Sequence, residues 1–245
     1  MGLKGKVALV TGIESAIGTA IARRFVEEGA QVAACQGAGT RSSTAPPGLF
    51  SEIEILYGNI ADRDQAQHMV NAVVDRFGRL DILINYGAAR RIIGTVLEIS
   101  PGEFDEEMRA DLASVIVLSA AAIPLMERSG GGAILNISSI AAAGLKGRAL
   151  RSSSKAALAA LTRAMAQDHG ANGIRVNALL LGPVQEGAPV ARADTPGIPI
   201  REGTLAHVTS PEDVAAAAHF LVSEEALAIT GVLLPVDGGR SLPTL

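Results

Sequence analysis

The residues whose chemistry is most evident lie between Asn136 and Lys155, in the stretch NISSIAAAGLKGRALRSSSK. Its pattern predicts a buried strand ending at Ser138 and Ser139, a loop of small residues, and the first turns of a helix. Arg151 precedes Lys155 by four residues, so both cations are expected on one face of that helix. Like charges at this spacing repel, and the helix dipole disfavours cations near its N-terminus. Such a pair either turns one cation into solvent or holds an anion.

Length and composition restrict the class of protein. The 245 residues are 48% hydrophobic but only 3% aromatic, so the core must be built from small aliphatic side chains, as in alternating strand and helix layers. A net charge of −4 without a basic block argues against nucleic acid as a partner. The single Cys35 excludes an internal disulfide framework and suits a reducing cytosol. We find no signal peptide and no apolar run of about 18 residues, so we expect a cytoplasmic protein without a membrane partner.

The hydrophobic pattern predicts alternating strands and helices. Short apolar runs predict buried parallel strands at residues 6–11, 31–35, 53–57, 80–85, 133–138, 174–180 and 232–236. Helical spacing predicts helices at residues 16–28, 62–77, 101–128 (as one or two helices), 151–169 and 211–222. We therefore predict one α/β domain over residues 1–245, a doubly wound parallel sheet of about seven strands with about six helices on both faces.

Two segments interrupt this alternation. Residues 36–51 are rich in Gly, Pro, Ser and Thr and predict a loop-rich insert, and residues 183–209 predict a flap. Ligands of doubly wound sheets bind at the carboxyl ends of the strands. The site is therefore expected in the loops that follow Thr11, Cys35, Asn85, Ser138 and Leu181.

A series of motifs points to one family. The turn TGIESAIG, from Thr11 to Gly18, joins the first strand to a helix, and its small residues allow a pyrophosphate to approach backbone N–H groups. LDILIN, NISS, Lys155, IRVNALLLGPV and ITGVLLPVDGG follow in that order. This set spans the whole chain and resembles the short-chain dehydrogenase/reductase family, within it the acyl-carrier-protein reductase and sugar dehydrogenase type. The resemblance implies a Rossmann-type fold.

The resemblance also implies a chemistry, hydride transfer between NAD(P)H and a carbonyl or alcohol. In the family a Tyr hydroxyl is the acid/base, a Lys four residues later lowers its pKa and holds the nicotinamide ribose, a Ser orients the carbonyl, and an Asn anchors a water connection to the Lys. Carried onto this chain, the Ser is Ser139, with Ser138 as the alternative because the following loop is one residue short. The Lys is Lys155, the Tyr position holds Arg151, and the Asn position holds Asp111.

The substitution at the Tyr position excludes the usual proton transfer. Arginine stays protonated near neutral pH and cannot hand a proton to a forming alkoxide. The two tyrosines of the chain, Tyr57 and Tyr86, lie far from Arg151 in the sequence. We therefore do not expect ordinary Tyr-dependent reduction.

The cofactor side of the resemblance is also altered. It implies NAD or NADP binding by Gly12, Ser15, Ile17, Gly18, Gln36, Asn59, Asn85, Gly87, Lys155, Gly182 and Val184. However, Ala16 replaces a glycine of the phosphate loop, and Glu14 adds a carboxylate to it. Gln36 and Asn59 stand where the family usually carries Asp, and Tyr86 can fill part of the cofactor cleft. We expect that binding of either cofactor is weakened or lost.

Each site residue also has a structural alternative. Ser139 can simply end a strand, and Lys155 can be a solvated helix residue. Arg151 can lie on the surface of an inactive site as readily as it can hold an anion. Asp111 can pair with Lys155 or with Arg151, and such pairs are often structural. The four histidines have no ligand spacing, so no metal site is predicted.

Three functional hypotheses follow. The favoured one is a non-redox member that binds a small molecule in the strand-end cleft, as a ligand sensor or as the partner subunit of an active paralogue. The second is an atypical NAD(P)-dependent carbonyl reductase or alcohol dehydrogenase with another proton route, for example water relayed through Lys155. The third is a cofactor-free lyase, isomerase or cyclase with Asp111 as base and Ser139, Arg151 and Lys155 stabilising an enolate or carboxylate. The resemblance further implies a homo-oligomer (dimer or tetramer) or a hetero-oligomer.

Overall fold

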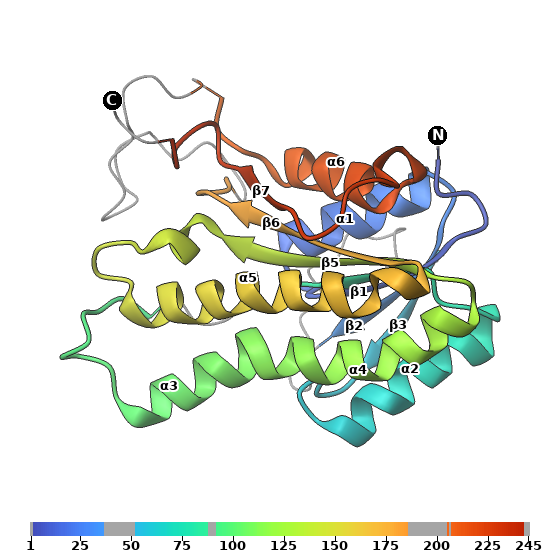
Figure 1. Ribbon diagram of the computed structural model, residues 1–245, viewed down its shortest axis with the longest axis horizontal. Coiled ribbons are helices and arrows are strands. Elements are labelled where there is room, and N and C mark those ends of the chain that lie inside the picture. The colour runs from blue at the N-terminus through green and yellow to red at the C-terminus, as the bar shows by residue number, and fades with distance from the viewer. Residues whose placement is uncertain (1, 37–51, 88–91, 186–204, 206, 243–245) are drawn as a thin grey trace.

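A parallel sheet forms the centre of the molecule. The computed structural model describes residues 2–36, 52–87, 92–185, 205 and 207–242. Seven strands pair in the order β3-β2-β1-β4-β5-β6-β7, and every pairing is parallel (Figure 1). They are β1 (Val7–Thr11), β2 (Gln31–Gln36), β3 (Ile53–Tyr57), β4 (Ile82–Asn85), β5 (Gly132–Ser139), β6 (Ile174–Leu181) and β7 (Leu233–Val236). The strand order reverses between β1 and β4, so the predicted doubly wound fold is confirmed.

Helices cover both faces of the sheet. On one face, α1 (Ala16–Glu27) packs against α6 (Pro211–Val222), and both bury aliphatic side chains in one core cluster. On the other, α2 (Arg63–Phe77), α4 (Ser114–Arg128) and α5 (Ala149–His169) share the second cluster. Figure 1 shows these two layers above and below the sheet. A core of this kind explains how the chain folds with few aromatic residues.

The long helical run after β4 differs from a regular helix. It consists of α3 (Pro101–Met108), the π-helical turn η2 (Arg109–Ala113) and α4, without a break. Among the described residues this run alone is long and apolar enough to cross a membrane, which the sequence had not led us to expect. More than half of its most apolar stretch is buried, and Leu118, Ala122 and Met126 lie fully in the core. The run is therefore explained as a core helix.

Local signals define the ends of the helices. The Asp62 side chain accepts from Gln65 N at the start of α2, and Gly78, in the left-handed conformation, ends that helix. Capping boxes open α3 at Ser100 and α6 at Ser210. These are the boundaries that the sequence predicts, within two residues.

Two of the predicted loop segments lie largely outside the described residues. Gln36, expected to begin the insert at 36–51, is instead the last residue of β2 and is buried, because the strand continues in register beside Tyr57. Residues 37–51, and residues 186–204 and 206 of the predicted flap, are not described.

Candidate functional site

A network of polar side chains joins the carboxyl ends of β4 and β5. Asn85 Nδ2 donates to Asn136 Oδ1 at 2.9 Å and to Ser119 Oγ at 3.2 Å. Asn136 donates in turn to Thr162 Oγ1 at 2.9 Å. Asn85, a predicted cofactor residue, thus links the sheet to α4 and α5, although its Oδ1 is buried without a hydrogen-bond partner among the described residues.

A buried ion pair lies beside this network. Lys155 Nζ lies 2.9 Å from Asp111 Oδ1, and the exposed fractions of the two side chains are 3% and 0%. Ser154 Oγ donates to the other carboxylate oxygen of Asp111 at 2.8 Å. Of the two partners considered for Asp111, the structure therefore selects Lys155. Both oxygens of the carboxylate have donors, which is what a buried charge requires.

The π-helical turn positions Asp111. In η2 the N–H of Ser114 bonds to the carbonyl of Arg109, five residues earlier, so the turn holds one residue more than an α-helical turn. The Ser114 hydroxyl also donates to Ala110 O at 2.6 Å. Because η2 packs directly on α5, Asp111 is held against the helix that carries Lys155. Such π turns occur often at functional sites.

Glu107 is a member of this cluster that the sequence analysis missed. It is 2% exposed, and its carboxyl group lies near that of Asp111, one helical turn further on. Burial and the neighbouring Asp111 raise the pKa of Glu107 to about 7, while the cations Arg151 and Lys155 oppose the shift. The run of acidic residues at 105–107 is typical of a solvated helix face, so Glu107 was not expected to be buried. The four-residue spacing to Asp111 was the available signal.

Arg151 lies at the edge of the same cluster. It is half-buried in the first turn of α5 and acts electrostatically on both Glu107 and Lys155. Its carbonyl accepts a hydrogen bond from Ser154 Oγ at 3.2 Å, but its guanidinium makes no hydrogen bond or ion pair with any residue that the structure describes. Burial lowers the pKa of Lys155, and Arg151 lowers it further, against the stabilising effect of Asp111. The two cations therefore share one site, as their spacing predicts, but only Lys155 is paired.

The two serines after β5 differ in their bonding. Ser139 Oγ accepts from Ala141 N at 3.2 Å and donates to Leu181 O at 3.3 Å, at the start of the 3-10 turn η3 (Ile140–Ala143). Ser138 is equally buried, but its hydroxyl has no hydrogen-bond partner within the described part of the chain. Ser138 is the alternative candidate for the serine that orients the carbonyl, and of the two serines it is the one whose hydroxyl makes no hydrogen bond to a described residue.

The glycine turn after β1 is closely packed. Gly12 has a φ of +73°, and a Cβ there would lie 2.7 Å from the Tyr86 ring. A Cβ on Gly18 would overlap the carbonyl oxygen of Gly12. Ser15 caps α1 by accepting from Gly18 N at 2.9 Å, while the Ile17 side chain is buried in the core. Gly12 and Gly18 are therefore required by the turn itself, whether or not a ligand binds.

A cavity of about 290 Å³ lies at the ends of β1, β2 and β4. The lining brings together four of the predicted cofactor residues, namely Gly12, Gln36, Asn59 and Gly87, with Tyr86 beside them. Asn59 Oδ1 accepts from Ala61 N at 3.0 Å, so this side chain also holds its own loop. The cavity lies at the carboxyl ends of the strands, where doubly wound sheets bind their ligands.

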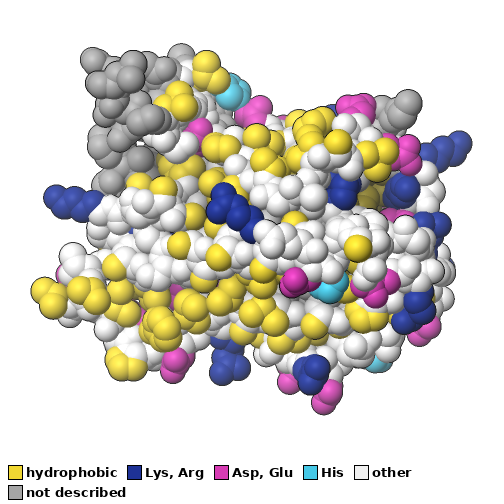
Figure 2. Space-filling model, viewed as in Figure 1, with side chains coloured by type: hydrophobic (Ala, Val, Ile, Leu, Met, Phe, Trp, Pro, Cys, Tyr) yellow, Lys and Arg dark blue, Asp and Glu magenta, His cyan; other side chains and the backbone are white. Residues whose placement is uncertain are grey.

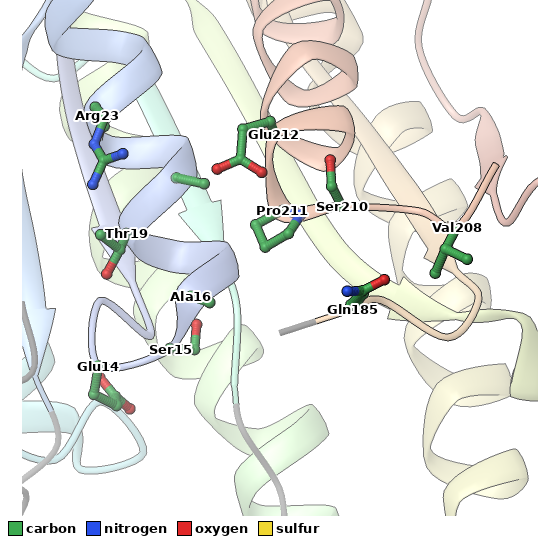
Figure 3. A pocket seen from close by; sticks show the side chains of 11 residues that line it. Glu14, Ser15, Ala16, Thr19, Arg23, Gln185, Val208, Ser210, Pro211 and Glu212 are labelled. Carbon is green, nitrogen blue, oxygen red and sulfur yellow. The ribbon is translucent and has the colours of Figure 1, made fainter. Parts of the chain in front are cut away.

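A second cavity, of about 600 Å³, lies between the first turns of α1 and the N-terminus of α6 (Figure 3). Ser15, Ala16 and Arg23 line one side, and Ser210 lines the other. Glu14 borders both cavities, and one oxygen of its carboxylate is buried without a hydrogen-bond partner among the described residues.

Glu14 also influences the pKa of Cys35, which lies on β2. Burial, with Glu14 adding to it, raises the pKa of Cys35 to about 12, so the thiol stays protonated.

Gly182 and Val184 complete the predicted cofactor set beyond β6. Gly182 packs against Asp237, where a Cβ would lie 2.7 Å from the Asp237 Cβ, and Val184 packs on the core. The described residues contain no cluster of His, Cys, Asp or Glu able to hold a metal ion.

The fold and the site define a class. A doubly wound sheet, a glycine turn after β1 and a buried lysine on the helix after β5 are those of a Rossmann-type α/β protein of the dehydrogenase class. Residues 12–241 match a family model described as enoyl-(acyl carrier protein) reductase. The chain belongs to the short-chain dehydrogenase/reductase family.

Its relatives are oxidoreductases. It is 36% identical to an uncharacterized oxidoreductase of Thermotoga maritima over 98% of this chain and 99% of the relative. It is 34% identical to meso-2,3-butanediol dehydrogenase of Serratia marcescens, over 98% and 96%. The structure of 3-ketoacyl-(acyl-carrier-protein) reductase from Brucella melitensis, complexed with NADH, superimposes with a TM-score of 0.86 at 29% identity, covering 98% of this chain and 100% of that one.

The family generally uses NAD(P), but the residues of this chain fit only part of such a cofactor. The cavity beside Gln36 and Asn59 suits adenosine. The carboxylate of Glu14 borders both cavities, and a carboxylate there would repel phosphates. Lys155, expected to hold the nicotinamide ribose, is bound by Asp111. The whole dinucleotide therefore does not fit this site well.

Proposed function

We propose that this member of the family does not run Tyr-dependent carbonyl reduction and acts instead by binding a small molecule in the strand-end cleft. The observation that carries the proposal is the buried Lys155–Asp111 ion pair, 2.9 Å long, one helical turn from Arg151. The usual reaction needs a neutral proton donor supported by a free ammonium group. Here the donor position holds a guanidinium, and the ammonium is already neutralised.

The altered cofactor side supports the same proposal. Glu14 opposes phosphates, and the ring of Tyr86 lies against Gly12. These changes leave the core intact, since the buried aliphatic clusters are complete on both faces of the sheet. A chain that keeps its fold but alters its chemical groups together is suited to binding rather than to the usual hydride transfer.

Calorimetric titration with NADH and NADPH tests the proposal. We expect no binding in the micromolar range for either. The Thermotoga maritima relative named 3-oxoacyl-(acyl-carrier-protein) reductase, which is 32% identical, serves as the control in the same buffers. Micromolar binding together with oxidation of NADH or NADPH by a ketone would overturn it.

A second candidate function has an observation of its own. The proximity of Glu107 and Asp111 places two carboxyl groups, one of them with a pKa raised to about 7, in one buried site, which is the usual basis of acid–base chemistry. It supports a lyase, isomerase or cyclase that needs no nicotinamide. Such an activity would be abolished in Asp111→Asn and unchanged by added NAD(P)H.

We also propose that the chain forms an oligomer, with itself or with an active paralogue. Hydrophobic side chains gather over α3 and α4 in Figure 2, and Phe104 and Ile116 are 48% and 46% exposed on these helices. A paralogue that shares this helical surface would be a suitable partner. Light scattering of the purified chain, alone and with the paralogue, tests this assembly, and a monomer at all concentrations would exclude it.

A further inference from the structure

The Glu107–Asp111 contact requires a shared proton, and the surroundings decide where it resides. Two carboxyl groups in contact cannot both ionise at low cost. Asp111 receives hydrogen bonds on both oxygens, from Lys155 and Ser154. Glu107 receives no such support, and its Oε1 is buried without a hydrogen-bond partner among the described residues. A proton held by the pair therefore resides on Glu107 rather than on Asp111.

The resulting cluster carries an excess positive charge. With Glu107 protonated, Asp111 neutralises Lys155, and the guanidinium of Arg151 remains uncompensated. Arg151 is half-buried, and its guanidinium has no bonding partner within the described residues. A guanidinium presents several N–H donors in a fixed plane and binds a carboxylate through two parallel hydrogen bonds. One carboxylate paired with Arg151 would balance the charge of the cluster.

We infer, on the basis of the proposed ligand-binding function, that the ligand is a small carboxylic acid whose carboxylate pairs with Arg151, and that Glu107 takes up a proton when it binds. The charged groups facing Glu107 in the described structure are Asp111 on its own helical run and Arg151 and Lys155 on α5. Of these, only Arg151 is free to pair with a ligand. No step of this inference involves a cofactor.

Proton uptake follows from the balance of charges. Arg151 is one of the groups that favour the ionised form of Glu107. When a ligand carboxylate neutralises Arg151, that support is lost and the ligand charge itself repels a second anion, so Glu107 becomes protonated. Because the pKa of Glu107 is about 7, binding at pH 7 takes up as much as about half a proton per ligand.

Calorimetry with acetoacetate in two buffers of different ionisation enthalpy measures this uptake. Acetoacetate is chosen because it carries a carboxylate beside a ketone, and methyl acetoacetate is its uncharged counterpart. We expect the wild-type chain to bind acetoacetate with proton uptake at pH 7 and to bind the ester at least about tenfold more weakly. Glu107→Gln should still bind acetoacetate, with no uptake.

Matched variants distinguish the loss of the pair between Arg151 and the ligand from a general loss of charge. Arg151→Gln should lose binding by about tenfold or more, whereas Arg163→Gln, an exposed change on the same helix, should not. Asp105→Asn, exposed on α3, should keep the proton uptake that Glu107→Gln loses. Carbon-13 NMR of labelled glutamate gives an independent reading, one carboxyl titrating near pH 7 that is absent from Glu107→Gln.

The outcomes distinguish this inference from the proposed function. If acetoacetate does not bind, or binds equally well to Arg151→Gln, the inference is wrong. The same holds if uptake persists in Glu107→Gln. The proposed function itself is rejected by a different result, the oxidation of NADH or NADPH by the wild-type chain with acetoacetate or its ester.

Discussion

Glu107 lies one helical turn before Asp111, and both carboxyl groups are buried close to each other. Residues at this spacing meet on one face of a regular helix. Here the π-helical turn intervenes, and both side chains face α5 and its cations. The relationship couples the protonation of one acid to the ion pair of the other, and several measurable properties depend on it.

Stability should fall as the pH rises through neutrality. Burial raises the pKa of Glu107 from about 4.5 in the unfolded chain to about 7 in the fold. Between these values the folded state binds more protons, so the stabilisation is complete below pH 4.5 and is lost as pH rises through 7. The contribution to the slope is at most about 1.4 kcal/mol per pH unit. Urea denaturation from pH 5 to 8 measures it. A wild-type slope unchanged in Glu107→Gln would contradict this origin.

Breaking the ion pair should be costly. Asp111→Ala leaves the Lys155 ammonium buried without its partner, so the free energy of unfolding should fall by about 3–5 kcal/mol. Asp111→Asn keeps an acceptor for Ser154 and should lose less. Chemical denaturation checks both variants, with the exposed Asp105→Ala as the control, expected within about 0.5 kcal/mol of wild type. A small decrease in the free energy of unfolding for Asp111→Ala would mean that the ion pair contributes little to stability.

Restoring reductase chemistry should require two changes. Arg151→Tyr alone places a phenol in the site while Asp111 still holds Lys155, so we expect no oxidation of NADPH by methyl acetoacetate. Arg151→Tyr combined with Asp111→Asn frees the ammonium, and slow turnover should appear. The assay follows NADPH absorbance, with Arg163→Tyr as the matched control. Equal activity in the single and double variants would show that the ion pair does not suppress the reaction.

Removing the carboxylate of Glu14 should improve cofactor binding. Glu14 borders both cavities of the predicted cofactor cleft. Glu14→Gln should therefore bind NADH at least about fivefold more tightly than wild type, with a smaller gain at high salt. Fluorescence of bound NADH provides the measurement, and Glu27→Gln on the exposed side of α1 provides the control. An unchanged affinity would mean that the carboxylate does not face the phosphates.

The sequence predicted the seven strands, the main helices and the doubly wound class, because alternating aliphatic runs and strong caps leave few alternatives, but it did not predict the π-helical turn. It also identified Lys155, Arg151 and Asp111 as neighbours. It did not decide the partner of Asp111, since ion pairing depends on side-chain direction rather than on spacing. Glu107 was missed because local composition cannot distinguish a buried acid from a solvated one within an acidic run.

The additional residue in η2 has a consequence for how this site can change. A π turn accommodates one extra residue within a single turn, so deleting Ala110 would restore a regular α-helical turn there while α3 and α4 keep their directions. Glu107 would then stand three residues before Asp111, a spacing that still brings two side chains to one helix face. The acidic companion of the ion pair therefore depends on the side chain at position 107, and the extra residue in η2 affects only how closely Asp111 meets Lys155.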